Sequence, residues 1–246
     1  MSPKIAAHYK FNDTLAVFGS IAHTERFPTL DEVYSTGGNS NTFNPSLDLS
    51  KERSNNYELG FAVSAFDLLQ QGDGLQIKTT GFYNDIKDLI SLNPALLTGP
   101  NALPGYVNIN QAEIYGFEVE AAYDSDYVFA NAGYSHVIGK NKITGAYLTT
   151  VAPHEFSLTL GGKVPEYDLK FGWTARFVAG PQDPARDTSV PPPRSTRFAE
   201  SFNVHDVFLS WTPQEGQLAG WSAEAGVENI FNTQYKEFLH NDAAKG

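Results

Sequence analysis

The chain has 246 residues, of which 41% are hydrophobic and 18% charged, a composition that fits neither a disordered tail nor a helical membrane protein. The formal net charge of −11 argues against a nucleic-acid partner, because no excess of positive charge compensates phosphates. Cysteine is absent, which excludes a disulfide framework and a thiolate metal site. No stretch approaches the ~20 consecutive apolar residues of a spanning helix, but a spanning β-strand needs only about ten residues, of which alternate ones face lipid.

Ten segments, taken in chain order, predict β-strands, because they are rich in aromatic and β-branched residues and are bounded by Gly, Pro, Asn or Asp. They are residues 5–9, 15–23, 56–66, 75–84, 112–123, 127–136, 155–163, 168–178, 202–211 and 221–230. In residues 114–121, one face carries Tyr115, Phe117 and Val119, and the other carries Glu118 and Glu120. Residues 169–177 and 221–228 repeat this alternation. A strand of a soluble β-sandwich alternates as well, so single strands leave both architectures open.

The connections between these segments alternate between short and long. The short ones are residues 10–14, 67–74, 124–126, 164–167 and 212–220, and the long ones are residues 24–55, 85–111, 137–154 and 181–201. Outer-membrane barrels have short periplasmic turns and longer extracellular loops. Aromatic residues such as Tyr9, Tyr123 and Trp211 recur beside the short connections, as in a girdle at the membrane–water boundary. The sequence therefore favours an antiparallel transmembrane β-barrel over a soluble all-β protein.

Several segments, in this order along the chain, resemble TonB-dependent outer-membrane receptors. They are residues 18–34 (FGSIAHTERFPTLDEVY), 44–49 (NPSLDL), 51–60 (KERSNNYELG), 82–90 (FYNDIKDLI), 112–118 (AEIYGFE) and 227–235 (VENIFNTQY). The resemblance covers nearly the whole chain, and the ordered set is more specific than any one motif. It implies a barrel of 22 strands around an N-terminal plug domain, with a TonB box that contacts the energy transducer TonB.

From this resemblance we expect residues 1–246 to form the C-terminal portion of such a barrel, about ten strands of the expected 22. On the same resemblance, we expect the plug domain, the TonB box and the last strand to lie outside this stretch. Residues 1–5 also lack the basic start and apolar core of a signal peptide, so we expect the true N-terminus to lie upstream. A sheet with two unpaired edges cannot close in a bilayer, and we expect no transport by this portion alone.

The sequence gives no support for catalysis. It has no Gly-x-Ser-x-Gly elbow, no His-Glu-x-x-His helix and no phosphate-binding glycine loop, so we expect a protein that is not an enzyme. Glu118 and Glu120 share one strand face and imitate a carboxylate pair, but the simpler interpretation is that they line a wet lumen. No histidine spacing indicates zinc, and we expect no metal site and no resident cofactor.

The candidate ligand-binding residues lie near predicted extracellular ends or loops, where an ordinary solvated side chain is the alternative for each. Histidines are able to touch a haem or metal chelate, and arginines pair bidentately with the carboxylates of an anionic chelate. The candidates are His23, Arg26, Tyr34, His136, His154, Arg194, Arg197 and His240.

Within the family, haem receptors have boxes like residues 26–28 and 44–47 with a histidine ligand between them. No histidine lies between Phe27 and Pro45 here, although His23 stands just before the first box. A ferric siderophore or another metal chelate is therefore at least as well supported as haem.

The resemblance thus implies a receptor in the bacterial cell outer membrane that takes up an iron chelate, a ferric siderophore or haem, with TonB-derived energy. Its expected partners are the chelate, outer-membrane lipid and TonB, the last through the N-terminal part. The alternatives are a passive porin-type channel, an outer-membrane enzyme, and a soluble β-sandwich binding module. The last predicts that the apolar faces of residues 115–119 and 169–173 are buried against each other.

Overall fold

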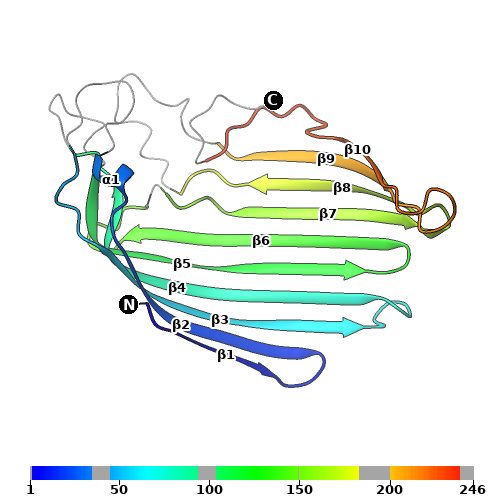
Figure 1. Cartoon of the computed structure of the whole chain (residues 1–246), viewed down its shortest axis with the longest axis horizontal. Coiled ribbons are helices and arrows are strands. Elements are labelled where there is room, and N and C mark those ends of the chain that lie inside the picture. Colours follow the sequence, from blue (N-terminus) through cyan, green and yellow to red (C-terminus); the bar gives the residue numbers. More distant parts are fainter. Residues whose placement is uncertain (1, 35–44, 94–103, 149, 183–199, 239–246) are drawn as a thin grey trace.

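The computed structural model describes residues 2–34, 45–93, 104–148, 150–182 and 200–238. They form one antiparallel sheet of ten strands, in which every strand pairs with its neighbour in the sequence (Figure 1). The strands are β1 (Lys4–Lys10), β2 (Leu15–Arg26), β3 (Glu52–Phe66), β4 (Gly74–Leu92), β5 (Tyr106–Asp124), β6 (Val128–Asn141), β7 (Glu155–Val164), β8 (Leu169–Val178), β9 (Phe202–Trp211) and β10 (Ala223–Val227). A short helix, α1 (Leu30–Tyr34), follows β2, and a 3₁₀ turn (Pro165–Tyr167) joins β7 to β8.

All ten predicted strands are present, and the predicted short connections lie together at one end of the sheet (Figure 1). We call this the turn end, and the opposite end, where strands lead into the long connections, the loop end. The long connections of the structure are residues 27–51, 93–105, 142–154 and 179–201. The predicted alternation of turns and loops is thus confirmed.

Several strand boundaries differ from the prediction, and β2, β3 and β6 extend further toward the loop end than predicted. β4 and β5 pair as far as Leu92 and Tyr106, so most of the predicted loop 85–111 is strand. The extension is stabilised because Ile86 and Ala112 are buried against Leu148 and Val151. The last strand ends early, at Val227, because Asn229 adopts a φ of 50° and its side chain closes a turn.

The register places side chains of opposite character on the two faces of the sheet. One row across the strands contains Val17, Phe61, Thr79, Val119 and Tyr134. We call the face with Val119 the apolar face, and the face with Glu118 the polar face. From Tyr57, Tyr83 and Tyr115 down to the turn end, the apolar positions of the described strands carry no Asp, Glu, Lys or Arg.

The apolar face is exposed, although it is the more hydrophobic one. Leu59 is 67% exposed, Phe117 41% and Phe171 50%. Residues 115–119 and 169–173 lie in the same layer on the same face, and the described residues contain no second sheet to cover them. The β-sandwich alternative, which predicted mutual burial of these faces, is therefore wrong for the part of the chain described.

Aromatic rings mark both borders of the apolar face. At the loop end, Tyr83 lies between Tyr57 and Tyr115, with ring centroids 6.4 Å from each. At the turn end, Tyr9 and Phe11 meet edge to face at 4.8 Å. Two rows of amphipathic aromatics with an uncharged band between them are the surface pattern of a transmembrane β-barrel.

Candidate ligand-binding site at the loop end

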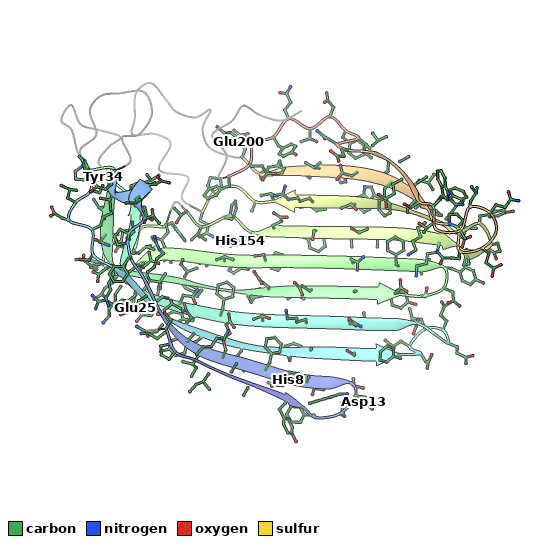
Figure 2. All side chains as sticks on the ribbon, in the orientation of Figure 1. His8, Asp13, Glu25, Tyr34, His154 and Glu200 are labelled. Carbon is green, nitrogen blue, oxygen red and sulfur yellow. The ribbon has the colours of Figure 1, made fainter. Side chains whose placement is uncertain are left out.

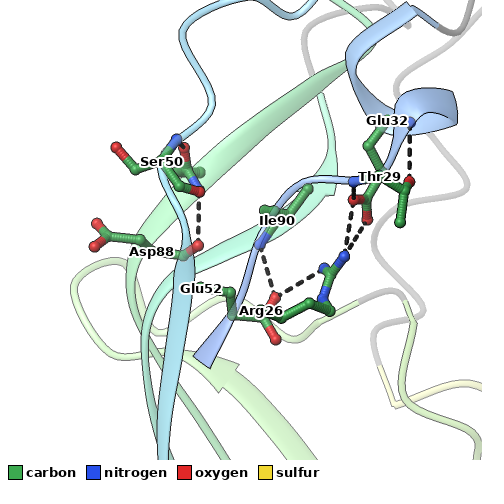
Figure 3. Close-up of polar contacts among 8 residues, drawn as sticks. Arg26, Thr29, Glu32, Ser50, Glu52, Asp88 and Ile90 are labelled. Atoms are coloured by element: carbon green, nitrogen blue, oxygen red, sulfur yellow. Dashed lines mark hydrogen bonds and ion pairs between the residues drawn. The ribbon is translucent and has the colours of Figure 1, made fainter. Parts of the chain in front are cut away.

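Arg26, the last residue of β2, forms a polar cluster on the polar face at the loop end (Figure 3). Its guanidinium donates to both carboxylate oxygens of Glu32, at 2.9 and 2.8 Å, and to Glu52 at 3.1 Å. Glu52 also accepts a hydrogen bond from the backbone N–H of Ile90 at 3.2 Å. One cation therefore joins β2, β3 and β4 to the helix in the following connection.

Helix α1 begins with a capping box. The Glu32 carboxylate accepts from the backbone N–H of Thr29 at 2.8 Å, and the Thr29 hydroxyl accepts from the N–H of Glu32 at 3.2 Å. Burial raises the pKa of Glu32, but the Arg26 guanidinium and the Thr29 N–H together lower it by more, so the pKa lies below its ordinary value. The Glu32 carboxylate therefore holds both the helix and the arginine.

A second anchor closes the base of the same connection. The N–H of Ser46 donates to the carbonyl of Val33 at 2.7 Å, and the Ser46 hydroxyl accepts from the N–H of Tyr106 at 2.9 Å. The Asn108 side chain bonds both backbone groups of Ser50, at 2.8 and 3.1 Å. Residues from the two family-like boxes, 26–28 and 44–47, thus fix the two ends of this connection to the sheet.

Arg176 on β8 forms a second cluster of the same design. It donates to Glu155 at 2.8 and 2.9 Å and to Glu237 at 2.6 and 3.1 Å. Its guanidinium lies 5.5 Å from the ring of Phe202, which stacks on Tyr235 at 4.6 Å. In both clusters an arginine holds one glutamate at a strand terminus and another from a segment outside the strands.

Of the predicted histidines, the three that the structure describes lie on the other face. His136 stacks on Phe117 at 5.3 Å and on His154 at 4.0 Å, all on the apolar face near the loop end. His23 contacts Asn55 through its Nδ1, 2.8 Å away, and this pair lies one step beyond Tyr57 on the same face. Their positions continue the border of aromatic rings on the apolar face, away from the Arg26 cluster.

His154 stands beside a hollow of about 480 Å³ whose lining includes Tyr134, Phe156 and Phe177. Burial, and then the neighbouring His136, lower the pKa of His154 below its ordinary value. Its Nδ1 has no hydrogen-bond partner among the described residues. A neutral imidazole suits this mostly apolar surrounding.

The remaining candidates are only partly placed. Tyr34 ends α1 and is exposed at the loop end, where Figure 2 labels it. Arg194, Arg197 and His240 lie outside the described residues. Of the predicted ligand residues, Arg26 therefore begins the connection that contains Tyr34, and the three described histidines lie on the opposite face.

Sequence reasoning missed Arg176 and the two glutamates that hold it. Arg176 belongs to the polar side of the alternating run 169–177 and lies near its loop end, so the sequence could have predicted its position on the polar face. The ion pair with Glu237 could not be predicted from a local pattern, because 61 residues separate the two in the sequence. The capping box of α1 was readable as the pattern Thr29-x-x-Glu32.

The described residues contain no group of three or more His, Cys, Asp or Glu side chains that is arranged to hold a metal ion. Within the same residues, no helix is long and apolar enough to cross a membrane.

The sequence profile of the family described as "TonB dependent receptor-like, beta-barrel" matches residues 1–230. The chain belongs to this family. Members of the TonB-dependent receptor family are β-barrels of the bacterial outer membrane and are transport receptors.

Two relatives of the TonB-dependent receptor barrel are curated proteins with haem in their names. "TonB-dependent heme receptor A" of Haemophilus influenzae Rd is 31% identical over 96% of this chain and 34% of its own length. "Hemin receptor" of Yersinia enterocolitica is 28% identical over 91% of this chain and 34% of its own length. The chain thus spans about a third of the curated relatives it matches.

Two solved structures share the fold. "Copper transporter OprC" has a TM-score of 0.73 at 20% identity, over 98% of this chain and 35% of its own. The Serratia marcescens hemophore receptor HasR, in complex with HasA and heme, has a TM-score of 0.72 at 24% identity, over 96% of this chain and 37% of its own. These likenesses show that the ten-stranded sheet has the shape of part of a TonB-dependent receptor barrel.

Proposed function

We propose that residues 1–246 are the C-terminal portion of the barrel of a TonB-dependent receptor in the bacterial outer membrane, and that the whole protein takes up an iron chelate. The observation that carries the proposal is the uncharged, exposed apolar face between two aromatic borders. Such a face is costly in water and suited to lipid. The long connections at one end then lie outside the cell, where the ligand arrives.

Among iron chelates, we propose haem as the ligand. The support is the printed names of the relatives, "TonB-dependent heme receptor A" and "Hemin receptor", at 31% and 28% identity. The likeness in fold extends to receptors named for copper and for iron, so the fold itself does not select the chelate.

In the proposed mechanism the extracellular connections capture the chelate, and TonB-derived energy displaces a plug domain encoded upstream. A passive porin-type channel is the rival function. It requires neither a plug nor TonB, so energy dependence separates the two.

The test uses the full-length protein in an outer-membrane host that lacks its own haem receptors and is starved of iron. We expect growth on haem when TonB is present and none when the tonB gene is deleted. Growth on haem without TonB identifies a passive channel. Growth on a ferric siderophore, with no response to haem, rejects haem and keeps the receptor function.

A further inference from the structure

We propose that Arg26 is a carboxylate-exchange latch, in which a carboxylate of the incoming chelate replaces Glu32 on the guanidinium and breaks the ion-pair link between helix α1 and the sheet. The inference rests on the proposed function, because it takes the ligand to be an iron chelate that carries free carboxylates.

The first argument is the charge of the cluster. One guanidinium faces two carboxylates, of Glu32 and Glu52, so the cluster holds an excess of one negative charge. A third carboxylate that reaches Arg26 raises this excess, and repulsion between like charges favours the departure of one of the three. The cluster is therefore built for exchange and not for simple addition.

The second argument is accessibility. The Arg26 side chain is 41% exposed, whereas Glu32 is 16% and Glu52 19% exposed. A ligand from the loop end consequently meets the cation before it meets either acid. A guanidinium has five N–H donors in a planar fork that matches a carboxylate, so a ligand carboxylate has donors to engage while exchange proceeds.

The third argument identifies the leaving group. Glu52 is the first residue of β3 and also accepts a hydrogen bond from the N–H of Ile90. If Glu52 were displaced from Arg26, a residue fixed in the sheet would lose its ion-pair partner. Glu32 belongs to the five-residue helix α1 and keeps its bonds with Thr29 after release. Exchange at Glu32 therefore costs one ion pair and leaves the capping box intact. What changes is the link between α1 and the sheet.

The decisive variant is Glu32→Gln in the full-length protein, with iron protoporphyrin IX and its dimethyl ester as probes. Glutamine serves in a capping box as glutamate does, so α1 keeps its cap while Arg26 loses its strongest competitor. We expect the affinity for the diacid to rise up to about 5-fold, the range of a partly exposed ion pair. We expect the affinity for the ester, which has no free carboxylate, to stay unchanged.

Asp31→Asn is the matched control. It removes the same charge from the same exposed turn of α1 but leaves both Arg26 pairs in place. A gain in diacid affinity from Glu32→Gln that Asp31→Asn does not share supports the latch. Equal gains in the two variants, or equal gains for the diacid and the ester, overturn it.

A second measurement detects the release of Glu32 from Arg26 without any porphyrin, through the mobility of helix α1. Residues 1–246 contain no cysteine, so a spin label at Asp31→Cys reports on α1 alone once any cysteine elsewhere in the full-length protein is replaced by serine. We expect millimolar citrate, a tricarboxylate, to increase the mobility of this label, and Arg26→Gln to show high mobility with or without citrate. An unresponsive label overturns the latch and leaves the uptake function standing. If the unmodified protein binds neither porphyrin, haem is rejected as the ligand, and the citrate response still decides the latch.

Discussion

Val119 on β5 lies on the apolar face, four residues from Tyr115 and four from Tyr123. At about 3.4 Å per residue along a strand tilted by ~40°, it lies about 10 Å from each aromatic border, near the middle of the proposed bilayer. An arginine there places a charge in hydrocarbon. We expect Val119→Arg to lower the free energy of unfolding in lipid by about 2–4 kcal/mol.

The matched control is Glu118→Arg, one residue away on the polar face. Its side chain faces a wet lumen, where a surface substitution changes the free energy of unfolding by about 0.5 kcal/mol or less. Guanidinium unfolding of the full-length protein in phospholipid vesicles, followed by tryptophan fluorescence, measures both variants. If Glu118→Arg costs as much as Val119→Arg, the apolar face does not meet lipid and the membrane assignment fails.

Three further outcomes are expected from single substitutions. Gly116→Ala places a Cβ against a backbone carbonyl of β6 and should reduce the folded fraction in heat-modifiability gels, whereas Gly81→Ala, with its nearest contact at 3.8 Å, should not. Burial raises the pKa of Asp73, but hydrogen bonds from three backbone N–H groups lower it by more, so the pKa lies below its ordinary value. The carboxylate therefore stabilises the β3–β4 turn at neutral pH, and this stabilisation is lost as the pH falls through the lowered pKa. Asp73→Asn should therefore flatten the acid limb of a stability–pH profile, and an unchanged limb would contradict this. Arg176→Gln should make the segment around Glu237 more sensitive to protease, with a cleavage rate equal to that of the parent as the opposing result.

The strands were predictable because each carries its own local signal. Residues 169–177 alternate without interruption, and the bounding Gly, Pro, Asn and Asp residues locate the turns. The extension of β4 was not predictable in this way. Asp88 adopts a φ of 57° within the strand, which breaks the alternation, and the strand continues because distant residues such as Leu148 cover Ile86.

The candidate site was predictable only in part. Arg26 was selected because it lies in a loop motif, but a loop position does not reveal that Glu32 and Glu52 already hold it. The histidines were selected by their distance from the loop end, without regard to their face. Counting from Tyr134 in steps of two assigns His136 to the apolar face, so this part of the information was present in the sequence.

The pairing of every strand with its sequence neighbour also bears on how the sheet is assembled. Each ladder closes across one connection, of which residues 27–51 are the longest, so the loop-closure entropy of each step stays small. The sheet is able to grow one hairpin at a time, with each finished strand as the template for the next. In the described sheet, β1 and β10 each keep one edge without a strand partner. A growing intermediate therefore exposes edges with unpaired backbone N–H and C=O groups until a further strand pairs with them. At this stage aggregation competes with insertion.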